Sequence, residues 1–306
     1  MRVLVGFDGS AGARDAIELT RVFCSTEGDE ALLVNVLPYG GPLPVAYSLL
    51  GYEDSVEVRE FFTDARVALA GIAVETRTYT GDSAAHVITD LAEAADMDLV
   101  VVGSPHRGAV GRTLIGSVAE SLLHGASTPI AVAPHGYAAR GGLEVVAIAY
   151  DGSAESKLAL KHAEALAGSV NAKLRVLTVV SPAVPVPGVV AYTPPIGFDA
   201  GELIEEAVAA VDSGVETEGR RLAGPPSSAL SKACADGVDL LVAGSRGYGP
   251  LGRAFVGSVT SRLICKSPCP VLVIPRSMAR AGSSSEAQSR DRDAEQAVEP
   301  KQIGKR

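Results

Sequence analysis

Long apolar runs are missing from this chain of 306 residues. No uninterrupted apolar stretch reaches the roughly 18 residues of a membrane-spanning helix, so we expect no membrane span. Cysteine is also scarce. Its four unevenly placed residues favour reduced thiols in a cytoplasmic protein over a disulfide framework. The amino-terminal segment reaches Asp8 too early for a signal peptide and is typical of a first strand.

Several catalytic signatures are absent too. The chain has no Walker A sequence, no Gly-x-Ser-x-Gly elbow and no His-Glu-x-x-His pair. Gly247, Gly249 and Gly252 have the spacing of a dinucleotide fingerprint, but the acidic residue that should follow about 20 positions later is missing. Cys265 and Cys269 lack the further ligands of a zinc site. We therefore expect neither a metal centre nor one of these catalytic sites.

Negative charge is in excess, with 36 acidic against 27 basic residues and a net charge of −9. This charge argues against nucleic acids and anionic membranes as partners. Residues 240–285 nevertheless contain no acidic residue, and the basic side chains there are Arg246, Arg253, Arg262, Lys266, Arg276 and Arg280. Such a neighbourhood suits a small polyanion, although the charges of helices and loops also cluster by chance.

What the chain does have is a repeated unit. The matching segments, at an offset of about 142, are residues 3–10 and 146–153, 96–104 and 237–245, and 128–134 and 269–275. We therefore predict two tandem domains, at residues 1–137 and 143–276. Residues 277–306 are rich in Ser, Arg, Asp, Glu and Gln, and this composition predicts a disordered tail.

Each unit alternates short apolar runs with amphipathic helical stretches. In the first unit we expect strands at about 2–8, 31–37, 73–79, 98–103 and 129–134, and helices at about 11–24, 54–70, 83–95 and 117–125. In the second we expect strands at about 143–150, 173–180, 238–244 and 270–274. Residues 215–222 are polar and mostly charged, so the third strand of that unit is expected to be short or absent.

Continuous runs of Val, Ile and Leu indicate strands that are buried on both faces. Strands that alternate with helices form a parallel sheet with right-handed crossovers, so we predict an α/β fold. Residues 38–52 and 181–201 are long for connections in such a fold. They are either binding loops or tolerated surface insertions.

A glycine-rich segment follows the fourth strand of each unit. Its marked positions are Gly244, Gly247, Gly257 and Ser258 in the second unit and Gly103, Gly116 and Ser117 in the first. Backbone N–H groups of such a turn can converge on a phosphate, and Ser258 is expected at the N-cap of the next helix. Asp8 and Asp151 end the first strands, where a carboxylate can accept hydrogen bonds from ribose hydroxyls or adenine.

Each feature also has a purely structural interpretation. Gly-Ser before a helix is a common capping sequence, and Asp-Gly-Ser after a strand is a common turn. The whole set nevertheless recurs at equivalent points of both units, where strands one and four are neighbours at the switch point of a doubly wound sheet. This recurrence favours a nucleotide site.

Residues 1–276 resemble the universal stress protein family in its tandem two-domain form. ATP-binding members carry Gly-x2-Gly-x9-Gly-Ser/Thr after strand four, and the second unit matches this motif in full. The resemblance implies that Asp8 and Asp151 bind the nucleotide and that Val36 and Val179 offer backbone groups to adenine.

The same resemblance implies two Rossmann-like domains of the adenine nucleotide α-hydrolase-like type. Each is expected to have a mainly parallel five-stranded sheet of order 3-2-1-4-5. The two domains are expected to associate through their fifth strands as an internal pseudo-dimer. A further homodimer and a protein partner are left open.

The first unit departs from the family motif, because His106 stands where the second glycine is expected. A side chain at a position that favours positive φ costs about 1 kcal/mol and crowds the phosphates. Gly108 is the nearest residue that restores flexibility. We therefore expect weaker or altered nucleotide binding in the first unit.

The leading hypothesis is an ATP-binding stress-response or regulatory protein, with Mg²⁺ accompanying the nucleotide. It is expected not to be an enzyme, since the second glycine-rich segment holds no carboxylate or histidine that could act as a base, and any hydrolysis should be slow. The alternative is an interaction module of the same fold that does not use nucleotide. An α-hydrolase-like enzyme would need a motif such as Ser-Gly-Gly-x-Asp-Ser, which is missing.

Overall fold

The structure is a computed structural model, and it describes residues 1–25, 27–37, 61–104, 116–139, 141–181, 199–212, 214–245, 257–276 and 278. Most of both long connections, most of both glycine-rich segments and the predicted tail lie outside the described residues. His106, Gly108 and Gly247 are among the residues that are not described. What we expect of them therefore stays a prediction.

The first half of the chain contains five strands and four helices in its described residues. Along the chain these are β1 (Arg2–Gly6), α1 (Ala11–Phe23), β2 (Glu30–Leu37), α4 (Thr63–Ala68), β3 (Ala73–Thr80), α5 (Ala84–Ala94), β4 (Leu99–Gly103), α6 (Ser117–Gly125) and β5 (Ile130–Ala133). The helix predicted over 54–70 is represented by α4, because residues 54–60 lie outside the described ranges.

The second half repeats this alternation. Its elements are β6 (Val145–Ala149), α7 (Ala154–Val170), β7 (Lys173–Val180), α8 (Ala200–Ala209), β8 (Thr217–Ala223), α9 (Pro226–Ala235), β9 (Leu240–Gly244), α10 (Ser258–Lys266) and β10 (Val271–Ile274). Among the helices of the described residues, none has both the length and the apolar character needed to cross a membrane.

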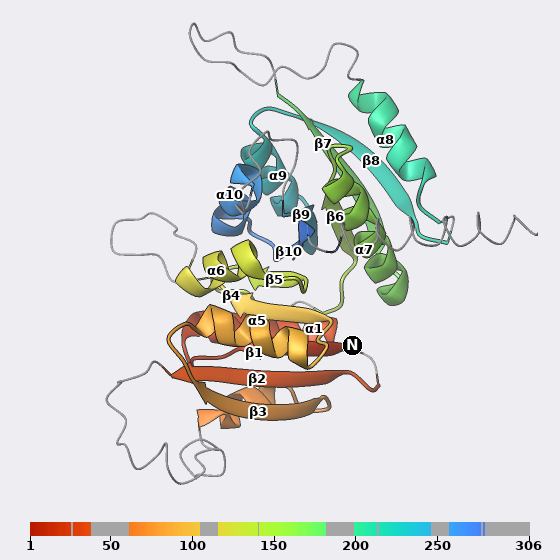
Figure 1. The fold of residues 1–306 in the computed structure, drawn as a ribbon. Coiled ribbons are helices and arrows are strands. Elements are labelled where there is room, and N and C mark those ends of the chain that lie inside the picture. The colour runs from red at the N-terminus through yellow and green to blue at the C-terminus, as the bar shows by residue number, and fades with distance from the viewer. Residues whose placement is uncertain are drawn as a thin grey trace, which may run out of the picture.

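The ten strands of the described residues belong to one sheet, in the order β3-β2-β1-β4-β5-β10-β9-β6-β7-β8. Within each half the order is 3-2-1-4-5 and neighbouring strands are parallel. The halves join where β5 pairs with β10 in the antiparallel direction, with Val132 opposite Val271. The two expected five-stranded sheets are therefore joined through their fifth strands into one continuous sheet (Figure 1).

Alternate residues of each strand face opposite layers of helices. On one face, Val3 and Val5 of β1 belong to a buried cluster that includes residues of α1 and continues to α7 of the second half. On the other face, Leu4 packs in a cluster with Ile88 of α5 and Leu122 of α6. Burial on both faces explains why the inner strands, such as β1 and β4, are uninterrupted apolar runs.

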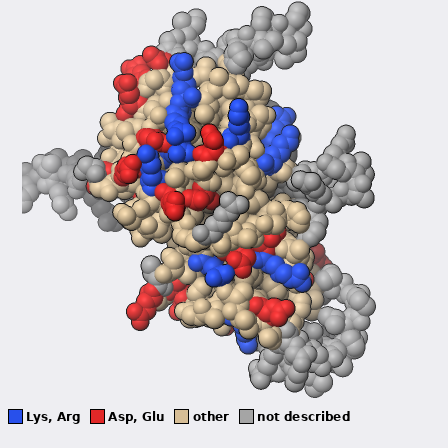
Figure 2. Space-filling view, turned by 180° about the vertical axis from the view of Figure 1, so that it is seen from behind, with Lys and Arg blue, Asp and Glu red and all other residues tan. Residues whose placement is uncertain are grey.

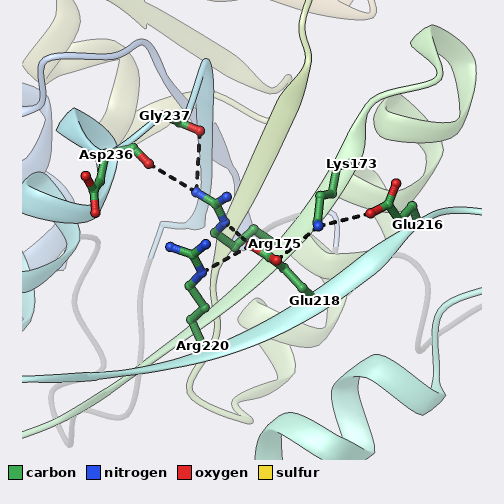
Figure 3. Close-up of polar contacts among 7 residues, drawn as sticks. All are labelled: Lys173, Arg175, Glu216, Glu218, Arg220, Asp236 and Gly237. Carbon is green, nitrogen blue, oxygen red and sulfur yellow. Dashed lines mark hydrogen bonds and ion pairs between the residues drawn. The ribbon is translucent and has the colours of Figure 1, made fainter.

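The third strand of the second half is present, which corrects the expectation that it would be short or absent. It is β8, a seven-residue strand at the edge of the sheet. Its charged residues are paired with β7 (Figure 3): Glu218 forms ion pairs with Lys173 Nζ at 3.0 Å and with Arg175 Nε. Polar residues on an exposed edge strand are compatible with pairing because cross-strand charges stabilise it.

This charged cluster lies at the amino ends of β7 and β8. Partial burial alone would raise the pKa of Glu218, but hydrogen bonds from Lys173 and Arg175 outweigh that effect and lower the pKa. Arg175 also donates to the backbone carbonyls of Asp236 and Gly237, at 3.4 Å each. The cluster thus links the outermost strand β8 and the end of α9 to β7. It lies at the amino ends of the strands, whereas the glycine-rich segments follow the carboxyl ends of β4 and β9.

Candidate functional site

The Asp-Gly-Ser turns occupy equivalent places, directly after β1 and β6. Asp151 Oδ1 accepts hydrogen bonds from the backbone N–H and the hydroxyl of Ser153, at 3.0 and 2.5 Å. Asp8 Oδ1 accepts the corresponding bond from the Ser10 N–H at 3.0 Å. The two serine hydroxyls then accept the N–H three residues further on, at 3.2 and 3.1 Å, and so cap α7 and α1. In each turn the hydrogen bonds to Oδ1 therefore hold the aspartate side chain in place at the carboxyl ends of the strands.

The middle residue of each turn must be glycine. Gly9 and Gly152 have φ values of +73° and +78°, a region that side chains disfavour. A Cβ at Gly9 would lie 2.9 Å from the ring of Phe61, and one at Gly152 would lie 2.8 Å from Leu203. The two halves thus place their aspartates with the same local structure.

Val179 and Val36 present backbone groups at this same edge. The N–H of Tyr150, just past β6, donates to the carbonyl of Leu177 at 2.9 Å, and the register of β6 with β7 ends at Leu177. Because backbone groups of residues i and i+2 point the same way, those of Val179 point past the end of β6. The equivalent 2.9 Å bond in the first half places Val36 in the same way beyond β1.

The first glycine of each motif has a packing role. An ideal Cβ on Gly103 would lie 1.9 Å from the backbone oxygen of Gly12 in α1. A Cβ on Gly244 would lie 3.1–3.2 Å from atoms of Glu155 in α7. In both halves the missing side chain therefore lets the end of the fourth strand lie against the helix that follows the neighbouring first strand. This helix is α1 in the first half and α7 in the second. Sequence reasoning had assigned this freedom at Gly244 to the phosphate.

The second glycine-rich segment is closed at its base. The N–H of Gly257 donates to the carbonyl of Ser245 at 2.8 Å, which joins the start of α10 to the end of β9. Thr260 of α10 also donates its hydroxyl to the carbonyl of Gly244 at 3.1 Å. These bonds hold the amino end of α10 beside the carboxyl end of β9, next to Asp151 on the neighbouring strand.

The N-cap of α10 is Gly257. Ser258 is the first residue of the helix, and it is exposed. This corrects the expected N-cap by one residue. The first half has the same arrangement, with Gly116 as N-cap and Ser117 as first residue of α6. Neither cap uses a side chain, so the first-turn N–H groups are not satisfied by a capping hydroxyl.

The expected basic neighbourhood is only partly visible. Lys266 ends α10, about 12 Å along the helix from its start. Arg276 Nε forms an ion pair at 3.0 Å with Glu155, whose side chain is 13% exposed. On the face shown in Figure 2, basic and acidic side chains are interspersed on both halves. Lys266 and Arg276 therefore lie at opposite ends of the parallel strands, and three members of the set lie outside the described residues.

Sequence reasoning missed the serine after the first glycine. Ser245 and Ser104 are buried, and their N–H groups donate to the carbonyls of Ile274 in β10 and Ala133 in β5, the last strand of each half, at 2.9 and 2.8 Å. The Ser245 hydroxyl further accepts the backbone N–H of Arg276 at 3.1 Å. The signal was available, because Gly-Ser follows the fourth strand in both repeats.

Comparisons with known proteins agree with this architecture. The model of the universal stress protein family matches the chain twice, at residues 1–134 and 143–275. A universal stress protein of Mycolicibacterium smegmatis is 30% identical over 296 residues, which cover 89% of this chain and 96% of that protein. One of Mycobacterium tuberculosis is 29% identical over 219 residues, covering 67% and 73%.

A solved structure shows the same fold. The crystal structure of a universal stress protein from Archaeoglobus fulgidus has a TM-score of 0.69 and 21% identity, and it covers 90% of this chain and 98% of that one. Together with the double match to the family model, this means that the chain belongs to the universal stress protein family, as two tandem Rossmann-like domains. The family is one of stress-response proteins.

Proposed function

We propose that this chain binds ATP, accompanied by Mg²⁺, at the carboxyl edge of its second half, and that it acts as a nucleotide-dependent regulator in the stress response. One observation carries the proposal: three features converge where β6 lies between β7 and β9. These are the carboxylate of Asp151, the backbone groups of Val179 and the amino end of α10. This is the switch point at which doubly wound sheets bind their ligands.

Each feature suits one part of the nucleotide. The Asp151 carboxylate uses Oδ1 in its turn, and its position at the strand end suits hydrogen bonds from ribose hydroxyls. The backbone of Val179 can pair with the polar edge of adenine. The first-turn N–H groups of α10 and the positive end of its dipole favour the phosphates, together with the segment from Gly244 to Gly257 that contains Gly247.

The second half is the better anion site on electrostatic grounds. The first turn of α10 contains no acidic residue, whereas the first turn of α6 contains Glu120. A carboxylate there opposes a phosphate at the same helix end, where a negative charge contributes about 0.3–1 kcal/mol. This difference adds to the His106 substitution in the first motif. We therefore expect the first half to bind ATP more weakly than the second.

The same site is proposed to bind nucleotide without fast turnover. The segment 244–258 contains no Asp, Glu or His that could activate a water molecule. Regulation would then follow from differential affinity of the nucleotide for two states of the protein or of its complexes.

Substitutions of the two aspartates test the proposal. Asn keeps the Oδ1 acceptor that the turn needs but removes the charge, so Asp151→Asn should fold and should weaken ATP binding about tenfold or more. Asp8→Asn is the matched control and should leave the tighter site unchanged. Affinity is measured by titration with ATP and Mg²⁺. Unchanged tight binding in Asp151→Asn would remove that carboxylate from the site.

A nucleotide-independent interaction module is the second candidate, and one observation favours it. The packing of Gly103 and Gly244 against helices accounts for the first glycine of each motif without any ligand. Nucleotide released from the purified, denatured protein separates the two candidates. Adenine nucleotide in the supernatant supports ATP binding, whereas an empty protein whose melting temperature does not respond to ATP and Mg²⁺ supports the interaction module.

A further inference from the structure

Two cysteines that are far apart in the sequence meet in the second half. Cys234 lies in the last turn of α9, and Cys269 lies two residues before β10. Both belong to one buried cluster, with 4% and 6% of their surface exposed. The two thiols lie close enough that each shifts the pKa of the other.

The surrounding hydrogen bonds fix Cys269 in place. The hydroxyl of Ser267 donates to the carbonyl of Cys269 at 2.8 Å and accepts its N–H at 3.3 Å. Ser231 of α9 donates to the carbonyl of Lys266 at 2.9 Å, which holds the end of α10 against the helix that carries Cys234. These hydrogen bonds hold together the two segments that carry Cys234 and Cys269.

The first half has no counterpart of this pair. There the end of α5 and the residues before β5 are bridged by a hydrogen bond of 2.6 Å from the Ser127 hydroxyl to Glu93. The thiol pair is therefore specific to the second half. It stands at the amino ends of β9 and β10, opposite to the candidate nucleotide edge, and β10 is the strand that joins the halves.

We propose that Cys234 and Cys269 are an oxidative modification site, at which a peroxide converts the two thiols to a disulfide between α9 and the start of β10. The Cys234 thiolate attacks one peroxide oxygen, the O–O bond breaks, and a sulfenic acid and water form. The Cys269 sulfur then attacks the Cys234 sulfur, and the hydroxyl leaves as a second water once protonated. Two thiols lose two electrons and two protons, and the peroxide is reduced to two waters.

The environment of the thiols supports this order of attack. The nearby thiol of Cys269 lowers the pKa of Cys234, and the same proximity raises the pKa of Cys269. A lower pKa gives Cys234 the larger thiolate fraction, and the thiolate is the nucleophile. Burial instead raises the pKa of Cys24 to about 11, so Cys24 serves as an internal unreactive control.

The test uses the reduced full-length protein, treated with hydrogen peroxide under native conditions. Remaining thiols are then alkylated in denaturant, and peptides are mapped by mass spectrometry without reduction. We expect two of the four thiols to be lost, with one linked peptide that joins Cys234 to Cys269. Cys265→Ser should retain this link, and Cys269→Ser should lose it.

Four alkylated thiols after oxidation would overturn the proposal, as would a disulfide that involves Cys24 or Cys265. A link that forms only between chains would overturn it too; it would appear as a dimer band on a non-reducing gel that depends on protein concentration and returns to monomer on reduction. The result with the unmodified chain decides the matter even if Cys269→Ser does not fold.

Discussion

Replacing Gly103 with alanine tests why glycine ends β4. The added Cβ would lie 1.9 Å from the Gly12 backbone oxygen and 2.3 Å from its carbonyl carbon, so a strand or a helix must move. Overpacking of this kind costs about 3 kcal/mol or more, and the smaller entropy of the unfolded alanine chain returns about 0.4–1 kcal/mol. We expect Gly103→Ala to lower the free energy of unfolding by about 2 kcal/mol or more.

Two further glycines calibrate this experiment. The contacts expected at Gly244 are 3.1–3.2 Å, so Gly244→Ala needs smaller shifts and should cost about 1 kcal/mol. Gly125, the last residue of α6, has no atom within 4 Å of an added Cβ, and Gly125→Ala should be neutral or stabilise by up to about 1 kcal/mol. Urea unfolding gives all three values. Equal stability of Gly103→Ala and Gly125→Ala would refute the packing argument.

Two pH dependences follow from the charged and buried groups. The folded-state pKa of Glu218 is lowered, so its contribution is present above the unfolded value of about 4.3 and is lost as the pH falls through the folded pKa. Acid unfolding of Glu218→Gln should therefore show a smaller loss of stability in that range. Burial lowers the pKa of His162, so the unfolded chain takes up the proton first as the pH falls below about 6.5. The unmodified chain should lose stability there, His162→Gln should not, and parallel pH curves would contradict the assignment.

The sequence predicts most of the fold because the strands are buried on both faces. The strands β1 and β4 can be recognised from their runs of Val and Leu. The sequence repeat then predicts the positions of their counterparts, β6 and β9. The strand β8 could not be recognised by that signal. Its residues are charged, and their pairing with Lys173 and Arg175 becomes visible only when β7 lies beside them.

The candidate site is predictable to a lesser degree. Asp8 and Asp151 are found where strand ends were expected, since Asp-Gly-Ser is a local turn with its own hydrogen bonds. The role of Gly103 needed the structure, because its neighbour Gly12 lies about 90 positions away in the sequence. The approach of Cys234 to Cys269 depends likewise on how α9 packs against α10, which no spacing in the sequence records.

Calorimetric titration of the full chain with ATP and Mg²⁺ tests the central claim most directly. The account predicts one tight site and one weaker site, loss of the tight site in Gly247→Val, and strengthening of the weaker one in His106→Gly. A folded Gly247→Val chain that binds ATP as tightly as the unmodified chain would contradict it.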